Sequence, residues 1–259
     1  MTALVASKFV GIEVFNSVKD RFKTAVIERW SKHRAEQFFH SFVQTLAHYD
    51  LKLVDETFVK AQLDSLFSDE LKTEVLYDAY RQVAFAASKT VGPRIIGILV
   101  ARLVHFRRLA NDGEEKILIA AESLNDDEFE KFEIFFKDVL ESEEQLRKRE
   151  FEKRRKYNVW KHEENGYEID LGSKKFDDYT SVTMSVDLDR QFGTWALKLQ
   201  SVGLLKASVH ETQKQERINH IEFFTNDVSR EQKSLIILPP ECDELFKLVC
   251  EAKNILAAE

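Results

Sequence analysis

The chain changes character along residues 125–156, which read NDDEFEKFEIFFKDVLESEEQLRKREFEKRRK. Asn125, followed three residues later by Glu128, is the pattern of a capping box at a helix N-terminus. Behind it, phenylalanines return at spacings of three and four, beginning with Phe129 and Phe132, as they do on the buried face of a helix. The second half of the stretch is almost entirely charged, with acidic residues preceding basic ones at distances that suit pairing along a helix. We therefore expect a long helix whose end is a charged, solvated connector.

The part of the chain before this helix is predicted to form successive amphipathic helices. Apolar residues recur at helical spacing in three groups: Phe15, Val18, Phe22 and Val26; Phe38, Phe42 and Leu46; and Leu63, Leu66, Phe67 and Leu71. Ser68 is the expected N-cap of a helix over residues 68–87, and residues 111–113, Asn-Asp-Gly, are a turn signal. The 259 residues include only 3 Pro and 8 Gly, which disfavours turn-rich β architectures. The predicted fold class is mainly α, with an N-terminal helical bundle.

After residue 156 the periodicity changes, and a small α+β domain is predicted. Residues 187–202 are expected to be one helix that ends at Gly203, and Pro239 and Pro240 open a final helix. The strand candidates are residues 204–209, 220–225 and 234–238, with polar stretches 210–219 and 226–233 between them and a β-prone segment at 180–186. The predicted domains are a helical bundle over 1–140, a charged connector helix and linker over 141–165, and a C-terminal domain over 166–259.

Two stretches of the C-terminal part carry a family resemblance. Residues 195–208, WALKLQSVGLLKAS, are a predicted helix that ends in Gly before a strand, and residues 234–249, SLIILPPECDELFKLV, are a predicted strand that runs into a helix. In this order the region resembles the C-terminal half of a winged-helix domain, over about a quarter of the chain. The resemblance is structural rather than chemical. It implies either a helix that enters the DNA major groove beside a β-wing, or a module that docks on protein.

Four polar residues share one predicted face of the helix over 187–202 and are the candidate nucleic-acid or partner contacts: Arg190, Gln191, Thr194 and Lys198. Arg and Gln can form paired hydrogen bonds with base edges, and Thr and Lys can hold phosphates. Charge argues against DNA, because residues 157–259 hold 12 Lys and Arg against 18 Asp and Glu, whereas phosphate binding needs local positive potential. A protein partner is therefore preferred, with DNA as the alternative.

The most apolar stretch, residues 83–106, bears on membrane association. Its uncharged run, residues 95–101, is far shorter than the roughly 20 apolar residues of a membrane-spanning helix, so integral insertion is not expected. We expect a buried helix entered at Pro93. The alternative is a peripheral helix that contacts an anion or a membrane surface through its cations. The candidate residues are Lys89, Arg94, Arg102, Arg107 and Arg108, with Arg81 added for an anion at the helix N-terminus.

Standard catalytic and cofactor signatures are absent from the sequence. Cys242 and Cys250 have no neighbouring Cys or His to complete a metal site and are expected to be buried free thiols. The histidines, at positions 33, 40, 48, 105, 162, 210 and 220, are scattered, and no phosphate-binding loop or nucleophile elbow is present. No metal, cofactor or catalytic residue is predicted. The sparse cysteines and the absence of a secretion signal at the start suggest a cytoplasmic protein.

These observations favour a non-enzymatic interaction or regulatory protein. The helical bundle would assemble with itself or with a partner, and the C-terminal module would dock on protein. Residues 1–108 carry 16 basic against 12 acidic residues, and residues 111–150 carry 6 against 14, which favours head-to-tail self-association or binding to an anionic surface. The alternatives are a DNA-binding transcriptional regulator that uses the helix over 187–202, and an effector or enzyme whose site is assembled from distant residues.

Overall fold

The computed structural model describes residues 32–49, 70–148, 156–162, 164–177, 186–220 and 223–257. Within these ranges the fold is mainly helical with one four-stranded antiparallel sheet, in agreement with the predicted class. The chain divides into two compact units: unit 1 combines Met1–Glu133 with Glu244–Glu259, and unit 2 is Ile134–Asp243. The helix predicted over residues 15–26, the cap at Ser68 and most of the β-prone segment 180–186 lie outside the described residues.

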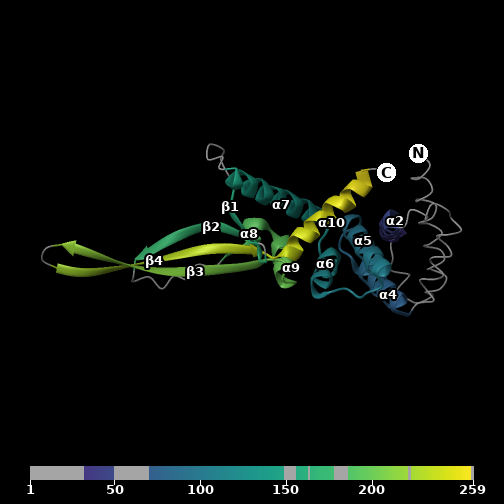
Figure 1. The fold of residues 1–259 in the computed structure, drawn as a ribbon, viewed down its shortest axis with the longest axis horizontal. Coiled ribbons are helices and arrows are strands. Elements are labelled where there is room, and N and C mark those ends of the chain that lie inside the picture. Colours follow the sequence, from purple (N-terminus) through teal and green to yellow (C-terminus); the bar gives the residue numbers. More distant parts are fainter. Residues whose placement is uncertain are drawn as a thin grey trace. The chain divides into compact units, whose positions relative to one another are not determined.

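Unit 1 is helical (Figure 1). It contains α2 (Lys32–Tyr49), α4 (Glu70–Phe85), α5 (Val91–Phe106) and α6 (Asp112–Ser123), with the first part of α7 (Asp126–Arg147) and most of α10 (Pro240–Ala257). Helix α5 contacts α2, α4 and α6. Its residues from Val91 to Val104 are all buried except Arg102, because a helix that is apolar on every side is stable only when neighbours surround it. Pro93 lies in its first turn, as predicted.

A glycine in the middle of α5 sets how closely a neighbouring helix packs against it. A Cβ atom at Gly97 would lie 2.5 Å from the carbonyl oxygen of Phe38 and 3.2 Å from the amide nitrogen of Phe42, both on α2. The backbones of α2 and α5 therefore meet without a side chain between them at this point. Phe38 and Phe42 are themselves fully buried, as is Ile95 on α5, so the contact lies within the core of unit 1.

Unit 2 is built on the sheet. Its strands are β1 (Asn158–His162), β2 (Gly166–Asp177), β3 (Lys206–His220) and β4 (Phe223–Leu238), in the spatial order β1-β2-β4-β3. Val159, Ile169 and Ile236 lie opposite one another across three strands and are buried. Aromatic packing continues this core, with the ring of Phe135 from α7 centred 5.3 Å from that of Trp195. Apolar residues alternate with polar ones where the sheet has a buried face.

The helix predicted over residues 187–202 is two helices, α8 (Leu188–Phe192) and α9 (Thr194–Ser201). Gly193 separates them with a backbone φ of 96°, a left-handed value that glycine adopts without steric cost. The prediction of a single helix is therefore wrong at this point. The amphipathic spacing of the sequence continues across Gly193, so the spacing alone did not indicate the break.

The strands of the C-terminal part were predicted too short. The polar stretches 210–219 and 226–233 belong to β3 and β4. Of the candidate at 220–225, His220 ends β3 and residues 223–225 begin β4. Backbone pairing within a hairpin satisfies N–H and C=O groups whether or not the side chains are apolar. The polar composition of these two stretches therefore did not indicate loops.

Three other predicted features can be compared with the fold. Asn111 is not only a turn residue: it caps α6, and Glu114 completes a capping box with it. Strand β1 lies within the range 141–165 that was predicted as connector and linker. Most of α10 groups with unit 1 rather than with the C-terminal sheet, while the predicted domain ranges themselves stay a prediction. The final helix begins at Pro240, as expected.

Candidate functional site

The N-terminus of α5 is closed by a carboxylate of the chain itself. Asp126, at the start of α7, accepts a hydrogen bond from Ser88 Oγ at 2.5 Å. It also accepts the backbone amides of Lys89 at 2.9 Å and Val91 at 3.0 Å, with that of Thr90 at 3.3 Å. Amides at a helix N-terminus are the donors that bind anions in proteins. Asp126 therefore stands where the sequence suggested an external anion.

The pKa of Asp126 reflects the hydrogen bonds that its carboxylate accepts. Burial of the group raises its pKa, but the hydrogen bonds from Ser88 and from the amides of Val91, Lys89 and Thr90 together outweigh burial and lower it. Ser88 is itself buried, and its Oγ accepts the amide of Gly92 at 2.9 Å. The loop before α5 is thus locked by one side chain from α7.

The cations predicted near the N-terminus of α5 do not gather around it. Arg94 is fully buried, and its Nε donates to Oε1 of Gln37 on α2 at 2.5 Å. It is a core residue and not a surface contact for an anion or a membrane. Arg81 is exposed. Its charge lowers the pKa of Glu122, but burial of that carboxyl group has the larger effect and raises the pKa. The side chain of Lys89 is exposed.

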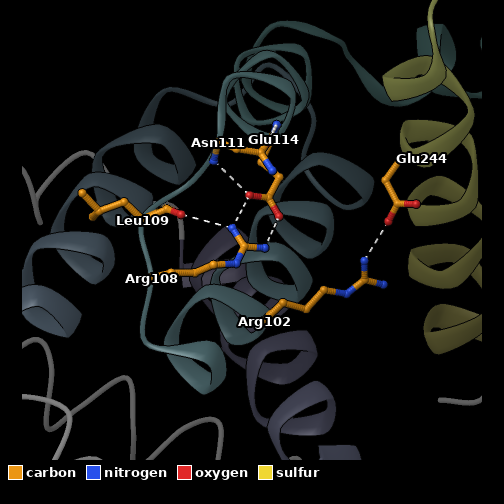
Figure 2. Close-up of polar contacts among 6 residues, drawn as sticks. All are labelled: Arg102, Arg108, Leu109, Asn111, Glu114 and Glu244. Carbon is orange, nitrogen blue, oxygen red and sulfur yellow. Dashed lines mark hydrogen bonds and ion pairs between the residues drawn. The ribbon is translucent and has the colours of Figure 1, made fainter. Parts of the chain in front are cut away.

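Two further arginines of the predicted cationic set bind carboxylates within unit 1 (Figure 2). Arg102 Nη1 lies 2.8 Å from Glu244 Oε1 and its Nη2 lies 2.9 Å from Glu251 Oε2, so one guanidinium joins α5 to two sites on α10. Arg108 donates to both carboxylate oxygens of Glu114, at 2.6 and 2.7 Å. Paired guanidinium–carboxylate geometry of this kind is among the stronger polar contacts in proteins.

Glu114 has a structural role that explains its pairing. Its carboxylate accepts the backbone amide of Asn111 at 3.0 Å, while its own amide donates to the Asn111 side chain at 2.9 Å. The hydrogen bond from Arg108 is the largest cause that lowers the pKa of Glu114, and burial opposes it. The same contact raises the pKa of Arg108. Arg108 therefore belongs to the cap of α6.

Of the five predicted cations, Lys89 and Arg107 are exposed and have no carboxylate partner in the part of the chain that the structure describes. Arg107 has a left-handed backbone at the C-terminus of α5, and its amide closes the last turn. Two separate cations give much less positive potential than the five-residue set that the sequence suggested.

The four candidate contacts near α8 and α9 are distributed over both helices. Arg190 and Gln191 are exposed on α8, and Thr194 is exposed at the start of α9, where Lys198 is half-buried. Because Gly193 interrupts the helix, the pair on α8 and the pair on α9 do not belong to one continuous helix. The structure therefore does not place the four side chains on one face of a single helix.

The main feature that was not predicted is the length of the β3–β4 hairpin (Figure 1). The two strands pair in one unbroken register from Lys206↔Ile237 to His220↔Phe223. Strand β2 pairs with β4 only as far as Asp177↔Ser229. Among the described residues, 215–220 and 223–228 therefore pair only with each other, as a two-stranded ribbon. A signal was present, because residues 204–238 contain neither glycine nor proline.

The base of the hairpin is held by side chains and its charge is balanced. Lys233 Nζ on β4 lies 3.3 Å from Asp170 on β2 and 4.5 Å from the ring centre of Trp160 on β1. Residues 206–238 carry five basic residues (Lys206, Lys214, Arg217, Arg230 and Lys233) and five acidic ones (Glu211, Glu216, Glu222, Asp227 and Glu231). A hairpin with no net charge offers little attraction to a phosphate backbone.

Other chemistries find no support in the described ranges. No helix there is long and apolar enough to cross a bilayer. No three His, Cys, Asp or Glu side chains gather there as metal ligands would. Cys242 is buried, and burial is the main cause that raises the pKa of its thiol, with Asp243 and Glu241 adding to it. A protonated, enclosed thiol behaves as a small apolar residue.

No protein-family model matches the sequence, and no similarity to a curated protein or to a solved structure was found. The functional argument therefore rests on the geometry of this chain alone.

Proposed function

We propose that this chain is a non-enzymatic interaction protein whose β3–β4 hairpin docks on a protein partner. The observation that carries the proposal is the ribbon of residues 215–228, whose described strands pair only with each other beyond the end of β2. Binding residues concentrate on loops and extended elements carried by a rigid scaffold. In unit 1, the starts of α5 and α6 are closed by side chains of the chain itself.

The balance of charge favours protein over nucleic acid. The hairpin carries equal numbers of acidic and basic residues. Mixed charges can be matched one by one on a protein surface, where they contribute mainly to specificity. Phosphate binding depends on counterion release by clustered cations. In unit 1, Arg102 and Arg108 are paired with carboxylates, which leaves contact with an anionic surface to Lys89 and Arg107 and makes it a weaker proposal.

DNA binding through a winged-helix-like module is the second candidate. It is supported by the order of elements in unit 2, where β2 is followed by α8 and α9 and then by the β3–β4 hairpin, with β4 lying between β2 and β3 in the sheet. The winged-helix resemblance implies this arrangement, with the hairpin as the wing. Arg190 and Lys198 would then contact DNA. The short α9 and the acidic balance of residues 157–259 make this the second choice.

A photo-crosslinking amino acid tests the first proposal. Placed at Gln215, it samples the ribbon, and placed at Ile119 on α6, which is 47% exposed, it samples unit 1. We expect protein adducts that depend on light from the Gln215 variant and far fewer from the Ile119 variant. Adducts with nucleic acid alone, or equal adducts from both positions, would contradict the proposal. Loss of nucleic-acid binding in an Arg190→Ala, Lys198→Ala double variant would instead establish the second candidate.

A further inference from the structure

Strand β3 forms one edge of the sheet. In the order β1-β2-β4-β3, its only neighbour among the described strands is β4. At its start the side chains of Lys206, His210 and Glu211 are exposed, and those between them are half-buried. An edge strand presents a row of backbone N–H and C=O groups on its outer side, which can pair with another strand. The outer side of β3 is 15 residues long.

This edge lacks two of the devices by which proteins block pairing between sheets. Residues 206–220 contain no proline, and their register with β4 runs without a bulge from one end to the other. Proline, bulges and runs of like charge are common ways to protect an edge. The charges of β3 are of mixed sign, with Glu211, Lys214, Glu216 and Arg217 close together. Such a strand repels a copy of itself only in some registers.

Symmetry restricts how two β3 edges can meet. In an antiparallel pair, two opposite residues either both direct their backbone N–H and C=O groups toward the partner strand or both direct them away, and the two kinds of residue alternate along a strand. Opposite positions are therefore both odd or both even, and the two-fold axis passes through a residue. This is the isologous contact expected of a two-fold dimer.

The longest antiparallel pairing of two β3 strands has its axis at Gln213 and uses all of residues 206–220. In it His210 lies opposite Glu216, Thr212 opposite Lys214 and Glu211 opposite Gln215. No carboxylate then faces a carboxylate, and no Lys or Arg faces another Lys or Arg. Moving the axis to residue 214 places Lys214 opposite its own copy, and like charges directly opposite are destabilising. Moving it to residue 212 leaves residues 219 and 220 without a partner.

We infer that β3 pairs antiparallel with β3 of a second copy of this chain about Gln213, which would join two sheets edge to edge. The inference rests on the proposed function, since it names the partner of the hairpin as the same protein. Backbone pairing along the strand provides the affinity, and the length of that pairing sets the register. The balanced charge of the hairpin is then a requirement of self-pairing, because a strand of one sign would repel its copy.

A pair of double variants separates this contact from a general effect of charge. Gln213→Glu with Gln215→Glu places a carboxylate at position 213 opposite its own copy and one at position 215 opposite Glu211 of the partner. Within the hairpin the same positions face Arg230 and Val228, so the hairpin itself is not weakened. Asn219→Glu with His220→Glu adds the same charge but places it opposite Ala207 and Lys206 of the partner, and opposite Phe224 and Phe223 within the hairpin. Circular dichroism of each variant checks that the fold is retained.

Sedimentation equilibrium at low salt measures the dimer dissociation constant. The first double variant introduces three opposed pairs of carboxylates across the dimer, so we expect its constant to rise about tenfold or more. The second should dimerise at least as tightly as the unaltered protein. An unaltered protein that stays monomeric, or two variants with equal effects, would overturn the inference. If the protein is monomeric while the crosslinker at Gln215 still captures another protein, the proposed function stands and self-pairing fails.

Discussion

The two units of the chain differ in how their polar groups are satisfied. In unit 1, the exposed amides at the start of α5 are bound by Asp126, and Arg102 and Arg108 are bound by carboxylates from α10 and α6. In unit 2, the outer side of β3 has no partner strand in the described residues, and among these residues 215–220 and 223–228 pair only with each other. The amides at the start of α5 and these two arginines thus have partners within unit 1. The hairpin leaves backbone groups available to another molecule, which is where we place function.

The largest expected effect comes from breaking the close contact between α2 and α5. Gly97→Ala places a methyl group against the backbone of Phe38 and Phe42, neither of which can rotate away. We expect a loss of about 3 kcal/mol in the free energy of unfolding, because overpacking a core forces backbone shifts. Urea denaturation measures it. Ile119→Ala, at an exposed position on α6, should change stability by less than about 0.5 kcal/mol. A fully stable Gly97→Ala variant would show that the helices do not meet here.

The second effect concerns the carboxylate that closes α5. Asp126→Asn keeps the shape of the side chain but removes the charge that four donors share. Hydrogen bonds to a charged group contribute more than neutral ones, so we expect a loss of about 1–2 kcal/mol. Asp127→Asn, at the exposed neighbouring position in the same helical turn, is the matched control and should cost only a few tenths of a kcal/mol. Equal losses for the two variants would rule out a specific role for Asp126.

The difference in the free energy of unfolding between the unaltered protein and Asp126→Asn should depend on pH, because the pKa of Asp126 is lowered in the fold. A carboxyl group with a lower pKa in the folded state stabilises the fold above its unfolded pKa, and this contribution is lost as pH falls through the folded value. The unaltered protein should therefore lose its advantage over Asp126→Asn below about pH 4. Denaturation curves of both proteins at pH 7 and pH 3 measure this. A difference that is the same at both values would contradict the assignment.

A smaller effect is expected from the ion pairs between α5 and α10. Arg102→Gln removes the contacts with Glu244 and Glu251, which are partly exposed, so the loss should be about 0.5–1 kcal/mol. High salt should reduce it, because screening weakens exposed pairs. Arg107→Gln is the control, since this arginine has no carboxylate partner within the described ranges. Thermal melts at low and high salt distinguish the two variants.

The smallest effect on stability should come from removing the ribbon. Replacing residues 215–228 by Asn-Gly joins Lys214 to Ser229, which already face each other in the hairpin, through a two-residue turn. Because the buried core of unit 2 involves the hairpin base, at residues such as Leu235 and Ile236, the melting temperature should stay within about 2 °C. A large drop would mean that the ribbon contributes to the core and is not an arm for docking.

Local signals in the sequence predicted several helix ends correctly. The capping box of Asn125 and Glu128 is present, with both hydrogen bonds at 2.9 Å, and Asp187 caps α8 through the amide of Arg190 at 3.1 Å. These contacts join residues three apart, so a short pattern contains all the information needed. The buried helix at Pro93 followed equally from its continuous apolar composition.

Contacts between distant parts of the chain could not be predicted in this way. Asp126 reaches Ser88, 38 residues earlier in the chain, and nothing near either residue indicates the other. Arg94 was a candidate contact for an anion or a membrane surface in the alternative interpretation of its helix, yet it is buried and bonded to Gln37. The helix break at Gly193 and the polar strands of the hairpin were missed for a different reason. Amphipathic spacing and polarity describe side chains, whereas backbone geometry decides where a helix breaks and which segments pair as strands.

The central claim, that the hairpin binds protein and not nucleic acid, is tested most directly by size-exclusion chromatography with light scattering on the purified protein. The mass and the ratio of absorbance at 260 and 280 nm are recorded at low and high salt. We predict protein free of nucleic acid, with a mass above that of one chain when the ribbon is present and that of one chain when residues 215–228 are replaced. Nucleic acid that co-purifies and is released by salt would contradict the claim and favour the winged-helix-like alternative.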